Sequence, residues 1–336
     1  MLNLKNGFIA LILLYSCAKK PVTQDQPSSF FANGADVSWL TEMEAAGIKF
    51  YDQQGSRQEC MQLLKGIGFN SIRLRVWVDP ANGWNNKNDV LTKAIRAKNL
   101  GMRLMIDFHY SDSWADPGQQ NKPAAWQAYD MSGLQTAVYD HTAEVLNLLK
   151  QNNIYADWVQ VGNETNDGFL WPGGKASVNM ANYAALFKAG YSAVKAVSPS
   201  SKVMVHLSNG FDNNLFRWNL GGLRANGAVW DVIGMSLYPS SANWAEKNDQ
   251  CFTNMNDMTG LYGSEIMITE VGMPWTDSAA SRLFIKDILN KVKSLPNNKG
   301  LGVFYWEPQS YNGWKGYTLG AFNNSGRPTV ALDAFR

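Results

Sequence analysis

Eight short apolar segments recur along the chain, each rich in β-branched and aromatic residues, and longer amphipathic segments separate them. They span residues 31–38, 71–77, 103–110, 157–164, 203–209, 232–238, 266–272 and 302–308. The intervening stretches carry apolar residues at helical spacing and end in Gly or Asn, as in 91–101 and 134–153. Strands that alternate with helices indicate a parallel sheet, and eight repeats predict an α/β fold, a single (β/α)8 TIM barrel over residues 31–336. An open doubly wound sheet is the alternative, but it more often begins with a glycine-rich phosphate-binding turn, and none follows the first segment.

Polar and aromatic side chains gather toward the carboxyl ends of these segments. They are Asp36, Ser38, Arg73, Arg75, Asp107, His109, Asn163, Glu164, His206, Asn209, Tyr238, Glu270 and Trp306. In a TIM barrel the carboxyl-terminal rim carries the active site, because loops can vary there without disturbing the packed layers below. A purely structural barrel does not need so many polar strand ends, so the pattern predicts a functional site at this rim.

Two glutamates end predicted strands, Glu164 on the fourth and Glu270 on the seventh. Charged residues rarely occupy such places unless they are paired or functional. Glycoside hydrolysis requires two carboxyl groups that converge on a cleft, one neutral to protonate the leaving oxygen and one ionised to attack or to activate water. The alternative for either glutamate alone is a structural salt bridge with Arg73 or Arg75. For both glutamates together, among amides and aromatic rings, the catalytic interpretation is favoured.

An amide and two histidines accompany these glutamates. Asn163 directly precedes Glu164 and suits a hydrogen bond to a sugar 2-hydroxyl. The Asn-Glu-Thr tripeptide also matches the N-glycosylation pattern, which we discount because a strand end is a poor acceptor site. His109 and His206 suit neutral hydrogen-bonding roles, because the chain has 3 His in all and no zinc-binding H-E-x-x-H spacing. His141 lies in a helical stretch and receives no function from the sequence.

The composition narrows the class of ligand. The 336 residues include 30 basic and 28 acidic side chains, and a formal net charge of +2 gives no case for binding nucleic acid or an anionic membrane surface. The chain contains 13 Trp, 13 Tyr and 15 Phe. Those on or beside the predicted rim indicate flat apolar surfaces on which sugar rings stack: Trp114, Trp171, Tyr238, Trp275 and Trp306.

The first residues predict an export signal rather than part of the fold. Lys5 supplies a positive charge, and the apolar residues 8–15 are far fewer than the roughly 20 that a membrane span needs. Cys17 follows directly, as in the lipobox of bacterial lipoproteins, where cleavage precedes a Cys that is then lipidated; an ordinary secretory signal with a chance Cys is the alternative. We expect a lipoprotein signal peptide and lipidated Cys17 in residues 1–17, then a polar tether in 18–30. The protein would be exported and lipid-anchored to the bacterial outer membrane or cell surface.

Cysteine is sparse, with 3 residues in the whole chain. Three thiols make neither a disulfide framework nor a four-ligand metal site. A bridge between Cys60 and Cys251 is open, although two buried free thiols are favoured. We expect no cofactor and no bound metal.

Eight motifs stand out along the chain: GADVS (34–38), IRLRVWVDP (72–80), IDFHYSDSWADPGQQNKPAAW (106–126), VQVGNET with FLWPGG (159–174), HLSNGFD (206–212), VIGMSLYP (232–239), ITEVGMPW (268–275) and GVFYWEPQ (302–309). Together they resemble the arabinogalactan endo-β-1,4-galactanases of glycoside hydrolase family 53. The resemblance runs from about residue 31 to near the C-terminus, and FHYSDSWADPG and GVFYWEP are its most specific parts.

The resemblance implies a (β/α)8 barrel of the large clan of retaining glycosidases, whose catalytic glutamates end the fourth and seventh strands. By position, Glu164 looks like the general acid/base and Glu270 like the nucleophile, and Arg73 falls near the nucleophile. Asn163, Tyr238 and Trp306 fall at clan positions around the sugar next to the cleaved bond. The resemblance also implies further cleft positions with less defined roles: His109, Asp112, Trp114, Trp171, His206 and Asn209.

The chain departs from the family in two places. Residues 270–283 lead quickly into the next helix where some bacterial members carry a calcium-binding loop, so we do not transfer that calcium site. Phe211 stands where the family often has Trp, which leaves product length open.

The expected function is retaining endo-hydrolysis of β-1,4-galactosidic linkages in the (arabino)galactan side chains of pectin, releasing galactooligosaccharides, by a monomer. Retention requires the two carboxyl groups to lie only about 5–5.5 Å apart. One alternative is a barrel glycosidase that acts on mannan or glucan. Another is a non-catalytic glycan-binding lipoprotein, in which loss of either Glu164 or Glu270 would be expected.

Overall fold

The protein is represented by a computed structural model that describes residue 2 and residues 31–336. The predicted lipidation site at Cys17 and the tether lie outside the described residues. Residues 31–336 form one compact unit. No helix in this described part is long and apolar enough to cross a membrane.

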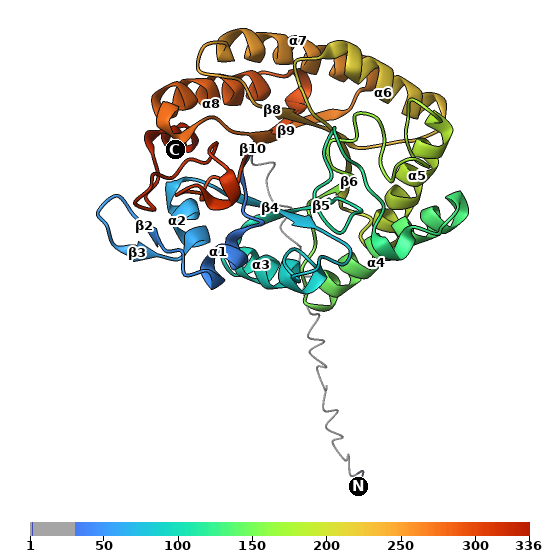
Figure 1. Ribbon diagram of the computed structural model, residues 1–336, viewed down its shortest axis with the longest axis horizontal. Coiled ribbons are helices and arrows are strands. Elements are labelled where there is room, and N and C mark those ends of the chain that lie inside the picture. Colours follow the sequence, from blue (N-terminus) through green and yellow to red (C-terminus); the bar gives the residue numbers. More distant parts are fainter. Residues whose placement is uncertain (1, 3–30) are drawn as a thin grey trace. The chain divides into compact units, whose positions relative to one another are not determined.

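Eight parallel strands of residues 31–336 close into a barrel, in the order β1-β10-β9-β8-β7-β6-β5-β4, which confirms the predicted fold (Figure 1). The barrel strands are β1 (Ala32–Asp36), β4 (Ser71–Val76), β5 (Arg103–Phe108), β6 (Trp158–Val161), β7 (Lys202–Leu207), β8 (Val232–Leu237), β9 (Glu265–Val271) and β10 (Gly300–Trp306). A short antiparallel pair, β2 (Phe50–Tyr51) and β3 (Arg57–Gln58), lies outside the barrel.

The α-helices surround the barrel and lie between successive strands in the chain (Figure 1). They are α1 (Leu40–Ala45), α2 (Cys60–Ile67), α3 (Lys87–Asn99), α4 (Met131–Gln151), α5 (Met180–Val197), α6 (Asn213–Ala225), α7 (Trp244–Tyr262) and α8 (Ser278–Lys293). The short 3-10 helices are η1 (Ala124–Trp126), η2 (Trp275–Asp277), η3 (Pro296–Asn298), η4 (Trp314–Gly316) and η5 (Val330–Phe335). Cys60 in α2 and Cys251 in α7 are free and buried, as favoured from the sequence.

Helix starts lie a few residues before the apolar pattern, because side-chain caps set them. The predicted helix at 91–101 begins at Lys87, where the Asn86 side chain accepts hydrogen bonds from two backbone N–H groups of the first turn. The predicted helix at 134–153 begins at Met131, and Asp130 caps it by accepting from the backbone N of Gly133 at 2.8 Å.

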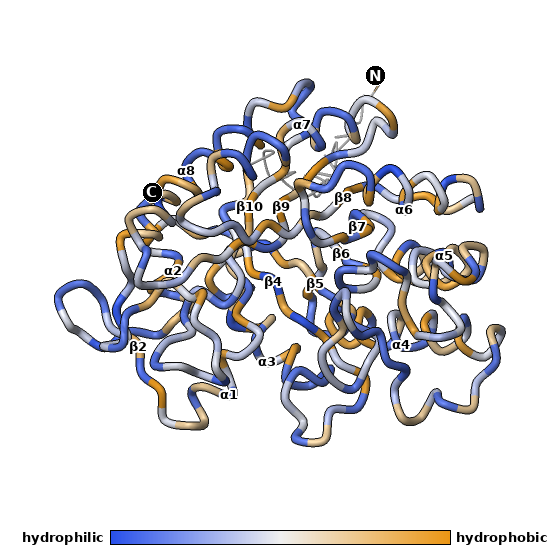
Figure 2. The backbone as a smooth tube through the Cα atoms, turned by 45° about the horizontal axis from the view of Figure 1, so that its top comes forward, coloured by the Kyte–Doolittle hydropathy of each residue, from blue (hydrophilic) through white to orange (hydrophobic). Residues whose placement is uncertain are grey.

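Side-chain alternation divides each strand between two environments. In β4, Ile72, Leu74 and Val76 belong to the large core between the sheet and the helices, while Arg73 and Arg75 occupy the alternate positions. Figure 2 shows hydrophobic segments along the central strands, and hydrophilic segments are common in the surrounding loops and outer helices.

The alternate positions change from apolar to polar along the barrel. A separate apolar cluster fills the amino-terminal half: Ala32, Met105, Trp158, Met204, Val232, Met267 and Phe304. Two to four residues further along these strands, the side chains are mostly polar: Asp36, Asp107, Gln160, His206, Ser236 and Glu270. Arg73 of β4 belongs to the same polar layer, because it contacts Asp36, Asp107 and Glu270. The interior of the barrel is therefore apolar in its amino-terminal half and polar in its carboxyl-terminal half. This polar layer forms the base of the candidate site.

Candidate active site

A cavity of about 570 Å³ opens at the carboxyl ends of the barrel strands. Loops that follow β5, β6, β7, β8 and β10 supply its walls, together with residues of β8, β9 and β10. Eight of the residues predicted from the sequence line it: His109, Trp114, Asn163, Glu164, Asn209, Tyr238, Glu270 and Trp306. Residues 106 positions apart in sequence, Glu164 and Glu270, thus share one cavity.

The loop after β6 places Glu164 in this cavity. The strand ends at Val161, so Glu164 follows it instead of lying on it as the sequence pattern indicated. Glu164 has a φ of 44°, in the left-handed region that is uncommon for a residue with a side chain. Its backbone N donates to Nδ1 of His206 at 3.3 Å, and the next N–H, of Thr165, donates to the His206 carbonyl at 2.9 Å. His206 therefore holds the turn that presents Glu164.

Glu270 lies on β9, beside a register shift between β8 and β9. Its Oε1 forms a salt bridge with Arg73 at 2.8 Å, and its Oε2 accepts a hydrogen bond from the Tyr238 hydroxyl at 2.8 Å. The structural salt bridge considered from the sequence is thus present, and it holds Glu270 in the cavity wall.

Arg73 is buried and joins three carboxylates below the cavity. Its guanidinium contacts Asp36 at 2.7 Å and Asp107 at 2.9 Å in addition to Glu270. It also donates to Oδ1 of Asn163 at 3.0 Å. Burial opposes the Arg73 charge, but the three carboxylates hold the pKa of Arg73 above its usual range. The guanidinium of Arg73 therefore holds Asp36, Asp107 and Glu270 in place, but its single positive charge does not balance three carboxylates.

The two cavity glutamates have different electrostatic surroundings. Burial raises the pKa of Glu164 to about 8, and the charge of Glu270 adds to the rise, while a hydrogen bond with Ser236 opposes it. Burial also raises the pKa of Glu270 to about 7, but the Arg73 charge and the Tyr238 hydrogen bond oppose the rise. The pair loses its protons in two linked steps, and the contacts with Arg73 and Tyr238 favour Glu270 as the first to ionise.

The two buried histidines are neutral partners with defined tautomers. His109 Nδ1 accepts from the backbone N of Ala115 at 3.1 Å, so Nε2 carries the proton and donates to Asp107 at 3.0 Å. Burial lowers the pKa of His109. His206 Nδ1 lies near the N–H groups of Gln160 and Glu164 and also 3.1 Å from Oδ1 of Asn163; with Nδ1 as the acceptor for the N–H groups, Nε2 donates to the Ser236 hydroxyl at 2.8 Å. Burial also lowers the pKa of His206 well below its usual value.

Aromatic rings form one wall of the cavity. Trp306 packs against Trp114, with ring centroids 5.8 Å apart, and against Tyr317, with centroids 4.7 Å apart. The buried Arg75 guanidinium lies 4.2 Å from the centre of the Trp114 ring, a cation–π contact that fixes this ring from behind. These flat, apolar faces suit the stacking of a sugar ring.

Four predicted residues do not line this cavity: Arg73 and His206 contact residues that do, whereas Asp112 and Trp171 have other partners. Asp112 accepts hydrogen bonds from the backbone N of Asp79 at 2.9 Å and of Ala124 at 2.8 Å, so it joins the loops after β4 and β5. Trp171 donates from Nε1 to the Asp167 carbonyl at 2.8 Å, and the Lys175 ammonium lies 4.7 Å from its ring centre. Both are half-buried, and their roles in substrate binding stay predictions.

The sequence model of glycosyl hydrolase family 53 matches residues 32–335. The chain belongs to this family. An arabinogalactan endo-β-1,4-galactanase of Thermothelomyces thermophilus is 31% identical over 330 residues, covering 90% of this chain and 98% of the relative. A solved fungal β-1,4-galactanase has a TM-score of 0.83 at 31% identity, covering 90% of this chain and 98% of that one. The family 53 catalytic domain of Ignisphaera aggregans has a TM-score of 0.83 at 30% identity, covering 93% and 97%.

Several cavity residues of this family 53 enzyme were not selected from its sequence. They are Ala115, Asp116, Pro117, Gln119, Ser208, Ser236, Tyr317 and Leu319. Ser236 could have been found, because it lies two positions before Tyr238 on a strand and therefore on the same face. Tyr317 comes from the long irregular segment after β10, where no periodic pattern exists to reveal it. Among residues 31–336, no group of three or more His, Cys, Asp or Glu side chains is placed to hold a metal ion.

Proposed function

We propose that this family 53 enzyme is a retaining endo-β-1,4-galactanase that hydrolyses (arabino)galactan side chains of pectin and releases galactooligosaccharides. The observation that carries the proposal is the pair Glu164 and Glu270 in one cavity, where Glu270 is the glutamate of the pair that binds Arg73 and Tyr238. The galactanase relatives, which cover most of the chain, support β-1,4-galactan as the substrate.

In the first step Glu270 is the nucleophile and Glu164 the acid. The Glu270 carboxylate attacks the anomeric carbon, and the bond from that carbon to the leaving sugar oxygen breaks. Glu164 gives its proton to this oxygen, so a galactosyl ester of Glu270 remains. The raised pKa of Glu164, caused by burial and by the Glu270 charge, keeps that proton available at neutral pH.

In the second step Glu164 is the base. The ester has removed the charge of Glu270, so the pKa of Glu164 falls and Glu164 ionises more easily. Glu164 takes a proton from water, the water oxygen attacks the anomeric carbon, and the ester bond to Glu270 breaks. Two inversions give a product with the β configuration, and both carboxyl groups return to their starting states.

The neighbouring residues position the sugar. Asn163 uses one Nδ2 proton for the Ala115 carbonyl at 2.8 Å and has a second Nδ2 proton for the sugar 2-hydroxyl. Trp306 and Trp114 supply stacking faces, and His109 and Asn209 supply polar atoms at the cavity wall. Arg73 and His206 are positioning residues. Arg73 binds the Glu270 carboxylate, and His206 binds the backbone of the turn that carries Glu164.

Azide rescue tests the two glutamate roles separately. With an aryl β-galactobioside that has a good leaving group, Glu164→Ala should form the ester without acid help, and azide should restore turnover as a β-galactosyl azide. Glu270→Gly should instead give the α-galactosyl azide, because azide then attacks directly from the nucleophile side. Rescue products of the opposite configuration, or wild-type galactan hydrolysis by either variant, would overturn the assignment.

Sugar release tests the substrate. Initial rates on linear β-1,4-galactan, mannan and carboxymethylcellulose should show release from galactan alone, with galactooligosaccharides of several lengths early in the reaction. Release from mannan or carboxymethylcellulose at a comparable rate would contradict the galactan assignment.

We also propose that the protein is an exported monomer, attached to the bacterial outer membrane or cell surface through lipidated Cys17. The apolar residues 8–15, followed by the small Ser16 and then Cys17, support this proposal. Cys17→Ala should move the protein from the membrane fraction to the soluble fraction, and light scattering should give the mass of one chain. Membrane association that survives Cys17→Ala would contradict the anchor.

A further inference from the structure

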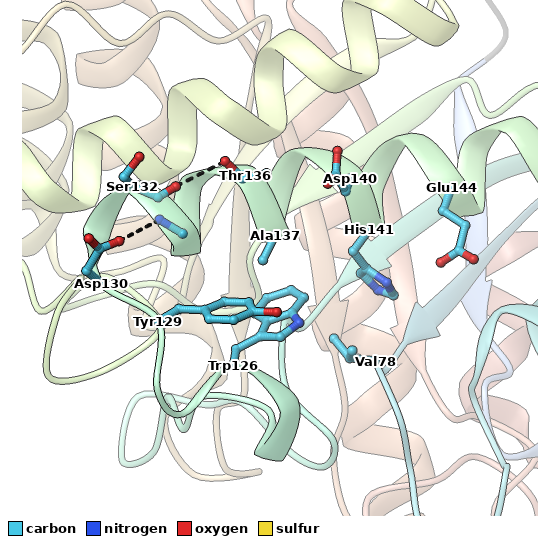
Figure 3. A pocket seen from close by; sticks show the side chains of 11 residues that line it. Val78, Trp126, Tyr129, Asp130, Ser132, Thr136, Ala137, Asp140, His141 and Glu144 are labelled. Carbon is cyan, nitrogen blue, oxygen red and sulfur yellow. Dashed lines mark hydrogen bonds between the residues drawn. The ribbon is translucent and has the colours of Figure 1, made fainter.

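A second cavity, of about 690 Å³, lies beside α4, and nothing in the mechanism uses it (Figure 3). Its walls are α4 from Ser132 to Glu144 and the segment that enters this helix, with Val78 from the loop after β4. The connection between β5 and α4, residues 109–130, lines both cavities: Trp114 and Gln119 face the catalytic one, and Trp126 and Tyr129 face the second. One loop therefore links them.

The second cavity has an aromatic side. Figure 3 shows the Tyr129 and Trp126 side chains together along one edge of the space, across from α4. Tyr129 leaves 44% of its surface exposed, which is high for a large ring, whereas Trp126 is buried. An exposed, rigid aromatic face at the mouth of a cavity suits stacking against the apolar face of a sugar ring.

His141 supplies a buried polar group without a partner. Its side chain is 7% exposed, it lines the cavity, and its Nε2 has no hydrogen-bond partner in the described structure. The ring extends from α4 into the space beside Trp126, with ring centroids 6.1 Å apart (Figure 3). A buried polar atom left unpaired is costly, so it requires an explanation. Nε2 is enclosed by protein, so a ligand hydroxyl in the cavity would satisfy it after a small shift of the surrounding side chains.

The charges around the cavity select the class of ligand. Asp130, Asp140 and Glu144 line it, and no Lys or Arg is among its lining residues in the described chain. Lys87 is nearby but is paired with Glu144. An acidic rim repels uronic acids and phosphates and accepts hydrogen bonds from neutral hydroxyls. Burial lowers the pKa of His141 to about 4, so its ring is neutral at physiological pH and can donate as well as accept.

We propose that this cavity is a second, non-catalytic carbohydrate site that holds a neutral β-1,4-galactan chain next to the catalytic cleft. Tyr129 stacks on a galactose ring, His141 bonds to a hydroxyl, and the carboxylates of the rim accept from others. The assignment of galactan rests on the proposed function. Because both sites belong to one molecule, a polymer held at the second site raises the local concentration of chain at the first, which a short substrate cannot exploit.

Retention in gels that contain polysaccharide measures binding at this site. In an inactive Glu270→Gln background, Tyr129→Ala should weaken retention by linear galactan about three- to tenfold, the range that one lost aromatic contact gives. Tyr139→Ala is the matched control, since Tyr139 lies on α4, is 37% exposed and does not line the cavity. Equal retention of the two tyrosine variants, or retention by polygalacturonate and not by galactan, would overturn the proposal.

His141→Phe separates a ligand role from a structural one. It keeps a ring in the buried space and removes the unpaired nitrogen, so the melting temperature should stay the same or rise while galactan retention weakens. A lower melting temperature with unchanged retention would assign His141 to the core alone and overturn its part in the site.

Kinetics distinguish a failure of this site from a failure of the proposed function. Tyr129→Ala should lower kcat/KM on polymeric galactan several-fold and leave kcat/KM on an aryl β-galactobioside unchanged. If wild-type enzyme does not cleave galactan, the proposed function fails. If wild-type enzyme cleaves galactan and Tyr129→Ala cleaves it equally well, the second site fails and the function stands.

Discussion

At the scale of single residues, the two glutamates differ through the hydroxyl group that each one contacts. The Tyr238 hydroxyl donates to Glu270, and Ser236 forms a hydrogen bond with Glu164. Both hydroxyl groups come from β8 or the residue after it, two positions apart on one face. The Tyr238 bond lowers the pKa of Glu270, and the Ser236 bond lowers the pKa of Glu164. Removal of the first bond should therefore move the acidic limb of the pH–rate profile, and removal of the second should move the basic limb.

Tyr238→Phe should move the acidic limb of kcat/KM to higher pH. Activity requires ionised Glu270, and the lost hydrogen bond raises the pKa of Glu270, so a higher pH is needed to ionise it. Since the bond is to a charged group, a shift of about one pH unit is expected. The measurement is kcat/KM on galactan from pH 4 to 10, and an acidic limb at its wild-type position would contradict the role of Tyr238.

Ser236→Ala should move the basic limb of the same profile to higher pH and leave the acidic limb in place. Activity requires protonated Glu164, and loss of the Ser236 bond raises the pKa of Glu164, so the acid form persists to higher pH. Ser236 also accepts the Nε2 proton of His206, so the variant leaves a buried donor unpaired and its melting temperature should fall modestly. Tyr238→Phe is the matched control, because it should move the acidic limb instead. A Ser236→Ala profile that shifts at both limbs would argue against a selective effect of Ser236 on Glu164.

Site residues could be predicted from the sequence where they interrupt or end a strand with a clear apolar pattern. Arg73 lies within a strand that has a clear apolar pattern, Glu270 and Tyr238 lie at or directly after the ends of two others, and the structure brings the three together. Asp36 and Asp107 were visible as polar strand ends, but no local pattern shows that both share the Arg73 guanidinium. Such contacts join strands far apart in sequence, so they depend on barrel closure rather than on spacing.

At the scale of elements, the strand pattern predicted all eight barrel strands but not their ends. The segment 157–164 contains β6, which stops at Val161, because Gly162 with a φ of 87° turns the chain before Glu164. The register shift between β8 and β9 beside Glu270 also has no signature in the apolar pattern. These irregular turns aim the two carboxyl groups, and they depend on contacts with neighbouring loops.

The floor of the barrel gives a test of packing between two elements. Gly34 of β1 pairs with Phe304 of β10, and a Cβ atom added to Gly34 would lie 2.2 Å from the Phe304 ring. Gly34→Ala should therefore reduce the free energy of unfolding by about 1–3 kcal/mol, the usual cost of overpacking. Adding Phe304→Leu should recover part of this loss, because the smaller side chain frees the space. Chemical denaturation of both single variants and the double variant measures the coupling, and strictly additive effects would contradict this contact.

At the scale of the whole molecule, closure of the barrel depends on its first strand. β1 pairs with β10 through Ala32 to Asp36 and with β4 through Gly34 to Asp36, so it joins the end of the sheet to its beginning. Asp36 on the same strand also binds Arg73, which in turn holds Glu270. The fold and the site therefore both depend on β1.

Two truncations test this dependence. A chain that starts at Phe31 retains every barrel strand and cavity-wall residue within the part of the chain that the structure describes, so it should fold cooperatively and hydrolyse galactan with the kcat/KM of the longer chain. A chain that starts at Trp39 lacks β1, which exposes the edges of β4 and β10 and removes Asp36 from Arg73. We expect it to aggregate or to lose its cooperative thermal transition. A shortened chain without β1 that keeps both its transition and its activity would show that the barrel closes without its first strand.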